Sequence, residues 1–481
     1  MSNPIVPGYI ELNNEWKDEW KENYIDFITP ALNDDGSVKI FTPDNKYIAQ
    51  DCKHFTQAGA KWYASIIDWK KFLAMNKLLQ INICSNVLST GKICEYIAKT
   101  SQQHGWDTFI AYGNSHKDSI SVEYKIAGKW NKYLHYVEHK LFDREGFGSR
   151  LVTYRMIKWI NKVKPDVIHL HNIHDHYLNY PLLFEYLAKI DIPVVWTQHD
   201  CWAFTGGCMY YDLQNCDKWK TGCKNCSEHR AFLCDATEKQ FALKRKLLSK
   251  IKNLTYVSVS DWLGSALKDS HQKDRPIMTI HNGIDISLFK PVVESSDGSN
   301  GSEDSSFDKV RKRGKYRIIG VAAVWDKRKG LEDFIKLRSL LPNDYEITLV
   351  GLTPKQVKSL PFGVKGITRT TNVQELVHLY SGSDVFVNPT YSDNFPTTNI
   401  ESLACGTPVI TYRTGGSPEA VDSKTGMVIE QGNVTALANA IMQMRENPLS
   451  SADCRKRAEE LFDKDKCFEK YVELYEELVK R

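Results

Sequence analysis

The sequence lacks any run of about 18 apolar residues, so no segment is expected to span a membrane. It also lacks a strong excess of charge of one sign. Its 63 Lys and Arg against 59 Asp and Glu give a net charge of +4, which argues against a nucleic-acid partner. The opening residues MSNPIVPGYIELNNEW do not have the basic and apolar regions of a secretory signal. We therefore expect a cytoplasmic protein.

The length of 481 residues and the 42% hydrophobic content predict a globular chain of two to three domains. Cysteine is abundant for a cytoplasmic protein, with 12 in the chain and five between residues 201 and 226. Because disulfides are rare in that compartment, metal binding is the better first interpretation of this segment.

Short apolar runs alternate with helical stretches along most of the chain. This alternation predicts parallel sheets covered by helices on both faces. The runs expected to be strands are 77–83, 165–171, 193–199, 254–260, 316–325, 345–351, 383–389 and 407–413. A Ser-, Gly- and Asp-rich segment at 294–315 interrupts the pattern and indicates a linker.

The predicted architecture is α/β, with two doubly wound domains facing each other across a ligand cleft at the carboxyl ends of their strands. The expected boundaries are an N-terminal segment 1–74, a first domain 75–285 with a Cys-rich loop 201–226, a linker 286–315, a second domain 316–460 and an amphipathic C-terminal helix 461–481.

Two carboxylates eight residues apart, Asp393 and Glu401, mark the most informative stretch of the sequence, 388–412. The turn 396–398 between them offers free N–H groups where a helix begins, and such a helix start binds a diphosphate well. Glu401, about one turn into that helix, could accept hydrogen bonds from a ribose diol. Spacing alone equally allows Asp393 to cap a loop and Glu401 to be solvated.

Several motifs together resemble the retaining glycosyltransferases of family 4, which have the GT-B fold. The resemblance covers about residues 75–481. It is carried by SDNFPTTNIESLACGTPVI, similar to the E-x7-E donor motif, and by WDKRKGLEDF, VSVSDWL, MTIHNGIDISLFKP and TGGSPEAV.

The resemblance implies roles for particular residues. Lys329, with its neighbour Arg328, would hold the donor diphosphate, and Glu401 the nucleotide ribose. Asp393 replaces the first Glu of the motif, which faces the sugar, and the Arg usually found shortly before Lys329 is absent. The remaining donor-site residues of the motif are Asn394, Phe395, Pro396, Thr397 and Thr398. Gly91, in the turn after the first expected strand, is also assigned to the donor site, because a glycine there lets the backbone approach phosphate or acceptor closely. No cofactor is expected to be required for catalysis.

Histidines cluster after two predicted strands of the first domain. His171 and His199 fall at neighbouring strand ends, where sites form. The resemblance places His171 near the donor sugar, as a catalytic residue, and His199 at the cleft floor with Asp200. Trp202 could contact the acceptor or pack. His169 is assigned to the core, on the face opposite His171.

The Cys-rich loop could bind one structural Zn²⁺ through four thiolates. The candidate ligands are Cys208, Cys216, Cys223 and Cys226. The alternative is that these cysteines are reduced and partly buried.

Residues 1–74 resemble the C-terminal end of an SGNH-type hydrolase or acyltransferase, through Asp51 and His54. Because that family's nucleophile and oxyanion blocks are missing, a remnant is the favoured interpretation, and one half of a site completed by another chain is the alternative.

The predicted activity is transfer of a sugar from a nucleoside diphosphate donor, of UDP or GDP type, to a glycan or lipid-linked acceptor in surface polysaccharide biosynthesis. At most peripheral contact with the inner face of the membrane is expected. The alternatives are a catalytically weak sugar-nucleotide-binding protein, a GT-B sugar-nucleotide epimerase, and an acyltransferase using Asp51 and His54.

Overall fold

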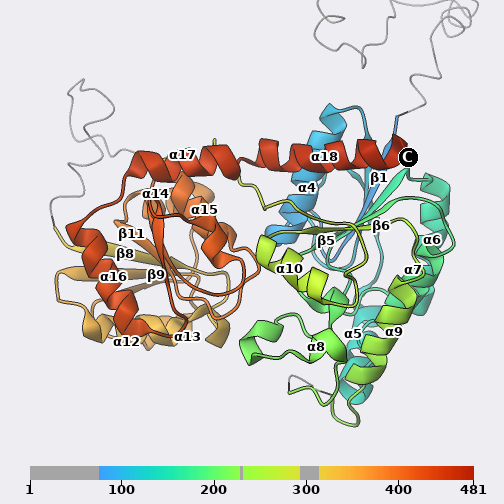
Figure 1. The fold of residues 1–481 in the computed structure, drawn as a ribbon, viewed down its shortest axis with the longest axis horizontal. Coiled ribbons are helices and arrows are strands. Elements are labelled where there is room, and N and C mark those ends of the chain that lie inside the picture. The colour runs from blue at the N-terminus through green and yellow to red at the C-terminus, as the bar shows by residue number, and fades with distance from the viewer. Residues whose placement is uncertain (1–74, 228–230, 293–313, 481) are drawn as a thin grey trace, which may run out of the picture. The chain divides into compact units, whose positions relative to one another are not determined.

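The computed structural model describes residues 75–227, 231–292 and 314–480 (Figure 1). The SGNH-like segment 1–74 therefore lies outside the described residues. Both sheets of the structure belong to one compact unit, Leu78–Thr100 with Thr108–Arg481. A second unit comprises Met1–Lys77 with Ser101–Asp107, and only a few of its residues are described. Within it, the Asp107 N–H donates a hydrogen bond to the Asn76 carbonyl (2.9 Å).

The first sheet has the strand order β3-β2-β1-β4-β5-β6-β7. Its strands are β1 (Lys77–Asn82), β2 (Asp107–Tyr112), β3 (Val122–Lys125), β4 (Val167–Leu170), β5 (Val194–Gln198), β6 (Leu254–Ser258) and β7 (Ile277–Thr279). β1 pairs in parallel with β4, and the parallel pairing continues through β5, β6 and β7. Every residue of β4, β5 and β6 is buried, as expected for strands covered on both faces.

The helices around this sheet are α4 (Leu88–Gln103), α5 (Lys129–Phe142), α6 (Arg150–Val163), α7 (Tyr180–Leu187), α8 (Lys218–Thr221), α9 (Thr237–Leu248) and α10 (Asp261–Asp269). Two short 3₁₀ helices, η3 (Trp202–Phe204) and η4 (Tyr211–Gln214), lie in the Cys-rich loop.

The second sheet is wholly parallel, with the order β10-β9-β8-β11-β12-β13. Its strands are β8 (Tyr316–Val321), β9 (Tyr345–Val350), β10 (Val364–Ile367), β11 (Val385–Asn388), β12 (Val409–Tyr412) and β13 (Gly426–Ile429). Its helices are α12 (Leu331–Leu340), α13 (Pro354–Lys358), α14 (Val373–Ser381), α15 (Thr397–Ala404) and α16 (Val434–Glu446), with 3₁₀ helices η6 (Lys327–Lys329) and η7 (Ser417–Ala420).

These sheets confirm the predicted fold class of two Rossmann-like domains. All eight expected strands are present, and sequence reasoning missed β2, β3, β7, β10 and β13. The missed strands are short or contain polar residues, as in VEYK of the edge strand β3, so they do not stand out as apolar runs. In each sheet the order reverses between two neighbouring strands, β1 and β4 or β8 and β11, and ligands bind outside the carboxyl ends at such a switch point.

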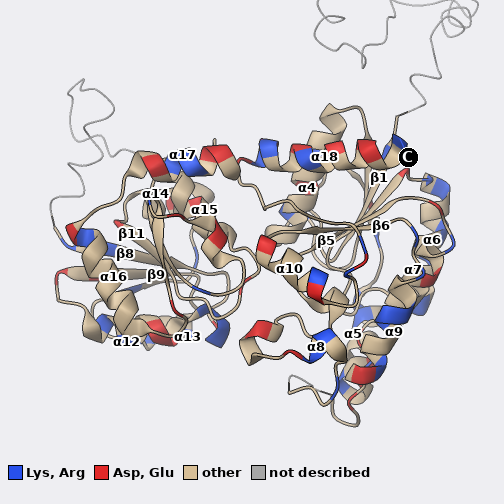
Figure 2. Ribbon diagram, viewed as in Figure 1, with Lys and Arg blue, Asp and Glu red and all other residues tan. Residues whose placement is uncertain are grey.

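The last two helices join the two sheets. α17 (Ser451–Leu461) contacts α15 through Arg455, whose guanidinium donates to the Ala404 carbonyl (3.0 Å). α18 (Lys464–Lys480) packs on the first sheet, where the Tyr475 hydroxyl lies 2.6 Å from His169 Nδ1. Charges of both signs alternate along α17 and α18 (Figure 2). None of the described helices is long and apolar enough to cross a membrane.

Candidate active site

The cations Arg328 and Lys329 lie in η6, which follows the carboxyl end of β8. Asp326 caps this turn by accepting a hydrogen bond from the Lys329 N–H (3.2 Å). Gly330 ends it with φ +71, and a Cβ there would lie 2.1 Å from the Pro389 carbonyl oxygen. Only glycine fits this close approach. The glycine of DKRKG therefore sets the end of η6, and with it the backbone positions of both cations.

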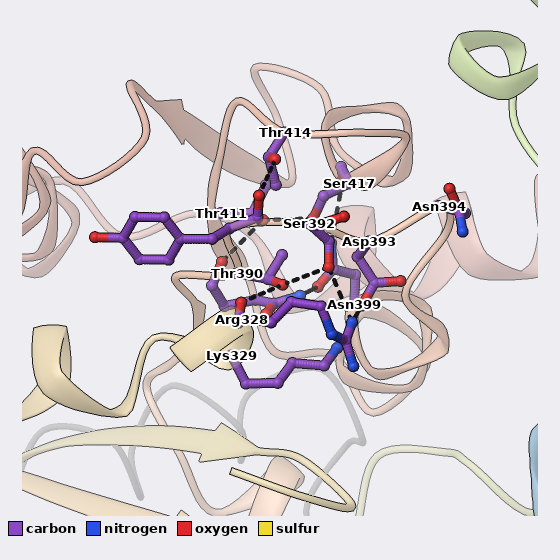
Figure 3. A network of polar contacts seen from close by, with 12 residues as sticks. Arg328, Lys329, Thr390, Ser392, Asp393, Asn394, Asn399, Thr411, Thr414 and Ser417 are labelled. Atoms are coloured by element: carbon purple, nitrogen blue, oxygen red, sulfur yellow. Dashed lines mark hydrogen bonds and ion pairs between the residues drawn. The ribbon is translucent and has the colours of Figure 1, made fainter. Parts of the chain in front are cut away.

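Asp393 comes from the neighbouring loop, between β11 and α15, and meets these cations. Lys329 Nζ donates a hydrogen bond to Asp393 Oδ2. Arg328 Nη1 lies 3.9 Å from the same oxygen and donates to the Ser392 carbonyl at 2.9 Å. Figure 3 shows both cationic side chains reaching toward Asp393. The switch point of the second sheet therefore holds two cations against one carboxylate.

A buried polar network joins the elements around the Asp393 loop (Figure 3). Asn399 accepts from Asn388 Nδ2 (2.8 Å) and donates to the Ser417 hydroxyl (3.0 Å). Ser417 in turn lies 2.6 Å from the Thr411 hydroxyl. Because these bonds join β11, α15, β12 and η7 inside the protein, they hold the loop in one arrangement.

The N-terminus of α15 faces the same loop. Its N-cap residue, Pro396, makes no side-chain cap hydrogen bond, so the first N–H groups at Thr397 and Thr398 are not capped by that residue. Such N–H groups carry partial positive charge that favours an anion. Phe395 is buried, with its ring 4.8 Å from that of His281. The buried Asn394 donates to the His199 carbonyl (2.8 Å) and so connects this loop to the first sheet.

Glu401 lies in the second turn of α15 and is partly buried. The Tyr380 hydroxyl donates to Glu401 Oε2 at 3.2 Å. Burial raises the pKa of Glu401, while hydrogen bonds from Tyr380 and Thr397 act in the opposite direction. Its carboxylate is therefore held by neighbouring hydroxyls.

His171 and His199 follow β4 and β5 and contact each other. His171 Nδ1 lies 3.1 Å from His199 Nε2, and His171 Nε2 lies 3.1 Å from Gln80 Oε1 on β1. Because Gln80 Oε1 can only accept, His171 Nε2 carries the proton and Nδ1 accepts from His199. Burial lowers the pKa of His171 well below its usual value and that of His199 to about 4, so both rings are neutral near pH 7.

The prediction for His169 was wrong in one respect. Its ring centroid lies 4.0 Å from that of His171, so both side chains lie on the same side of β4. Residues two apart in a strand share a face, and the sequence argument had placed them on opposite faces. His169 is nevertheless fully buried.

Asp200 forms a buried ion pair with His174, with Oδ2 2.7 Å from Nε2. Burial alone would lower the pKa of His174, but the Asp200 carboxylate raises it to about 9. Trp202 is 1% exposed, and its indole lies under the buried Lys244, whose Nζ is 3.9 Å from the ring centroid. The structure therefore places Trp202 in the core of the first domain.

Gly91 lies within the first turn of α4, whereas the sequence placed it in the turn before the helix. A Cβ at Gly91 would lie 3.0 Å from Cys84 Sγ and 3.2 Å from the Asn86 nitrogen. The residue allows this helix to start close to the loop after β1.

Sequence reasoning missed two residues of the Cys-rich loop that contact the donor-site loops. The Arg328 guanidinium lies 4.7 Å from the centre of the Tyr210 ring, and the Ser392 hydroxyl donates to Asp212 Oδ1 at 2.7 Å. Asp212 Oδ2 is buried with no hydrogen-bond partner among the described residues. No sequence signal identifies a contact across 180 positions.

The four candidate zinc ligands of the Cys-rich loop do not form a cluster in the described part of the chain. Among the described residues, three ligand-type side chains lie close enough together to hold a metal, and they are Asp261, His281 and Glu419. The Cys223 thiol instead accepts from the Gly206 N–H (3.2 Å), and burial raises its pKa to about 11. A zinc site at the cysteines stays a prediction.

Glu419, in the TGGSPEAV turn, caps a helix of the other domain. Its carboxylate accepts from the N–H groups of Asp261 and Trp262, each at 2.8 Å, at the start of α10. His281 Nε2 lies 2.9 Å from Glu419 Oε2. The carboxylate is thus already occupied by protein donors, and sequence reasoning did not assign it a partner.

Comparison with known proteins identifies the class of molecule that this fold and site define. The family model Glycosyltransferase Family 4 matches residues 91–288, and the model Glycosyl transferases group 1 matches residues 302–461. The chain is a glycosyltransferase with the GT-B fold. More particularly, its first domain is similar to the glycosyltransferases of family 4, over residues 91–288.

Relatives and solved structures agree with this assignment. The chain is 24% identical over 401 residues to the "Putative colanic acid biosynthesis glycosyl transferase WcaC" of Escherichia coli, covering 76% of this chain and 91% of that protein. It is 24% identical over 235 residues to the N,N'-diacetylbacillosaminyl-diphospho-undecaprenol alpha-1,3-N-acetylgalactosaminyltransferase of Campylobacter jejuni, covering 47% and 61% of the two chains.

Two solved structures show the same fold. Sucrose-phosphate synthase from Thermosynechococcus elongatus has a TM-score of 0.62 at 18% identity, covering 84% of this chain and 99% of that one. Anabaena Alr3699/HepE in complex with UDP has a TM-score of 0.54 at 16% identity, covering 84% and 100%.

Proposed function

We propose that this glycosyltransferase moves a sugar from a nucleoside diphosphate sugar to a glycan or lipid-linked acceptor in surface polysaccharide biosynthesis, with retention of anomeric configuration. The observation that carries the proposal is the pair Arg328 and Lys329, held against Asp393 beside the N-terminus of α15. The names of two relatives, one of colanic acid biosynthesis and one acting on a diphospho-undecaprenol glycan, support the acceptor class.

The chemistry follows from where charge develops. Transfer breaks the bond between the anomeric carbon and a phosphate oxygen and forms one to the acceptor oxygen, whose hydroxyl proton passes to the departing diphosphate. Negative charge accumulates on the departing diphosphate, where Lys329, Arg328 and the first N–H groups of α15 would stabilise it. Such fixed donors need no reorganisation during the reaction, and we propose that no cofactor is required.

The other residues would position the donor. Glu401, held by Tyr380, would bind the ribose diol. Asp393 would face the sugar while orienting Lys329. The neutral pair His171 and His199 would border the sugar from the first sheet, with the proton of His171 fixed by Gln80.

The test is calorimetric binding of UDP and GDP to the full-length protein and to Lys329→Ala. A charge-assisted hydrogen bond contributes about 1.5–3 kcal/mol, so binding should weaken roughly tenfold or more. Lys327→Ala is the matched control, because Lys327 lies in the same turn but is exposed. Equal binding by wild type and Lys329→Ala would place the diphosphate elsewhere.

Product analysis separates the remaining alternatives. Incubation with the nucleotide sugar that binds, followed by NMR of the product, should show the retained configuration in an acceptor glycoside. An altered sugar nucleotide formed without acceptor would indicate an epimerase. Binding without any turnover, across candidate acceptors, would indicate a sugar-nucleotide-binding protein.

A further inference from the structure

The Cys-rich loop extends from the first domain to the loops that carry the proposed donor site. It begins at Cys201, shortly after the carboxyl end of β5. Within it, η4 starts at Tyr211, and Tyr210 is the N-cap residue of that turn. Tyr210 and Asp212 both contact side chains of the second domain. Two residues of one short turn therefore connect the first domain to the donor-site loops.

Tyr210 covers one face of Arg328. The central carbon of the guanidinium lies 4.7 Å from the centre of the Tyr210 ring, which is a cation–π distance. Arg328 Nη1 also donates to the Ser392 carbonyl at 2.9 Å. A guanidinium has five N–H donors, so one bond to a carbonyl leaves others for a diphosphate. The ring and the carbonyl therefore fix the plane of the guanidinium without using all of its donors.

Asp212 completes a closed ring of contacts with the same residues. Its Oδ1 accepts a hydrogen bond from the Ser392 hydroxyl at 2.7 Å. Ser392 also accepts from Arg328, and Arg328 lies against Tyr210, two positions before Asp212. The side chains of Tyr210 and Asp212 thus hold Arg328 and Ser392 between them, and we call these two residues the η4 clamp.

The first domain holds both sequence neighbours of Asp393. Ser392 is held by the η4 clamp, and Asn394 donates to the His199 carbonyl at 2.8 Å. Ser392 is 1% exposed and Asn394 is 5% exposed, so both bonds are shielded from water. Asp393 is therefore fixed on either side, and with it the carboxylate that accepts from Lys329.

Asp212 is a costly residue for a contact that only stabilises the fold. Its Oδ2 is buried and has no hydrogen-bond partner among the described residues. Burial raises the pKa of Asp212, and the nearby Asp393 carboxylate adds to this effect, whereas the Ser392 hydroxyl opposes it. A buried carboxylate that is only partly paired destabilises a fold. Such groups gather at functional sites, and this one adjoins the proposed donor site.

We infer that Tyr210 and Asp212 are positioning residues that hold Arg328 and the Asp393 loop in place for the donor diphosphate. The inference rests on the proposed function, because Arg328 meets a diphosphate only if the donor binds at this site. It gives the Cys-rich loop a part in donor binding, in addition to the acceptor contact and the metal site expected from the sequence.

The test is calorimetric binding of UDP and GDP to the full-length protein and to variants of the η4 clamp. Tyr210→Leu should weaken binding of whichever nucleotide the wild type binds by about three- to tenfold, as expected for loss of a cation–π contact. Tyr210→Phe keeps the ring and should restore binding to within about twofold of wild type. Gln214→Ala is the matched control, because Gln214 lies in the same turn and is exposed.

A double-mutant cycle separates positioning from a general loss of structure. Because Tyr210 acts through Arg328, Tyr210→Leu should have no further effect on binding in the Arg328→Ala background, where Lys329 keeps binding measurable. Equal losses in both backgrounds would overturn the inference, as would a Tyr210→Leu variant that binds as wild type does. A wild type that binds neither nucleotide would instead overturn the proposed function, and the inference with it.

Asp212 is tested in the absence of nucleotide. Hydrogen exchange in the segment 390–396 should be about tenfold faster in Asp212→Ala than in wild type, because the loop has lost one of its two ties. Asp212→Asn keeps an oxygen for the Ser392 hydroxyl and should restore slow exchange. Unchanged exchange in Asp212→Ala would overturn the role of Asp212, and so would faster exchange spread over the whole chain, which indicates a general loss of stability.

Discussion

Lys329 donates a hydrogen bond to Asp393, the residue that takes the first position of the E-x7-E motif. The two residues come from loops after neighbouring strands, β8 and β11, and are 64 positions apart. Asp393 therefore holds the main phosphate-binding cation of the proposed site. An incoming diphosphate must share Lys329 with this carboxylate.

This relationship predicts opposite effects of Asp393→Asn on binding and on turnover. Removing the negative charge should tighten binding of the nucleoside diphosphate by about two- to tenfold, because Coulomb repulsion is lost and Lys329 is released. Sugar transfer should fall by about tenfold or more, since the cation is no longer oriented. Calorimetry and initial rates measure the two effects, and parallel losses in both would show that Asp393 only supports the loop.

Gly330→Ala should destabilise the protein and weaken nucleotide binding. The substitution forces a side chain into φ +71 and against the Pro389 carbonyl, at a cost of roughly 1–2 kcal/mol or more. Gly128→Ala is the matched control, because φ is −81 and a Cβ there meets nothing within 4 Å. Urea denaturation and calorimetry compare the two, and an equal effect at both glycines would contradict the role of the turn.

The His174–Asp200 pair predicts a loss of stability at alkaline pH. The pKa of His174 is raised from 6.5 to about 9, so its contribution is complete below pH 6.5 and is lost as the pH rises through 9. A shift of this size corresponds to roughly 3 kcal/mol. The pKa of Asp200 is lowered from 3.8 in the folded protein. Its contribution to stability is therefore present above pH 3.8, and it is lost as the pH falls through the lowered pKa.

Asp200→Asn tests this pair. The variant should lose about 3–5 kcal/mol at neutral pH and show no decline between pH 6.5 and 9.5, because the histidine has lost the partner that keeps it charged. Thermal unfolding across that range is the measurement. Asp191→Asn, at an exposed position, should behave as wild type does. An unchanged alkaline decline in Asp200→Asn would assign the pH dependence to another group.

Glu419→Gln should destabilise the protein by about 1–3 kcal/mol. The amide can offer only one oxygen where the carboxylate accepts from the N–H groups of Asp261 and Trp262. Urea denaturation measures the loss. The exposed Glu446→Ala serves as control, and a variant as stable as the control would show that the cap at α10 contributes nothing net.

The sequence located the parts of the candidate site that follow from local chemistry. Apolar runs predicted the central strands, because strands buried on both faces need nearly every side chain to be apolar. The short strands β7 and β10 were missed for the same reason, since a three-residue IMT or a Gly-containing VKGI has no such pattern. DKRKG and the NFPTTNIE stretch marked the loops after β8 and β11, and parallel topology brings those loops together.

What the sequence alone determined is therefore the fold class, the central strands and the residue types of the donor-site loops. Tertiary structure decided the partners that lie far apart in the chain: Tyr210 under Arg328, Asp212 on Ser392, and Glu419 on α10. It also decided which face of α5 is exposed. Periodicity shows that a helix has an apolar stripe, but the packing that buries His135, 3.0 Å from the Ser149 hydroxyl, leaves Trp130 and Leu134 exposed.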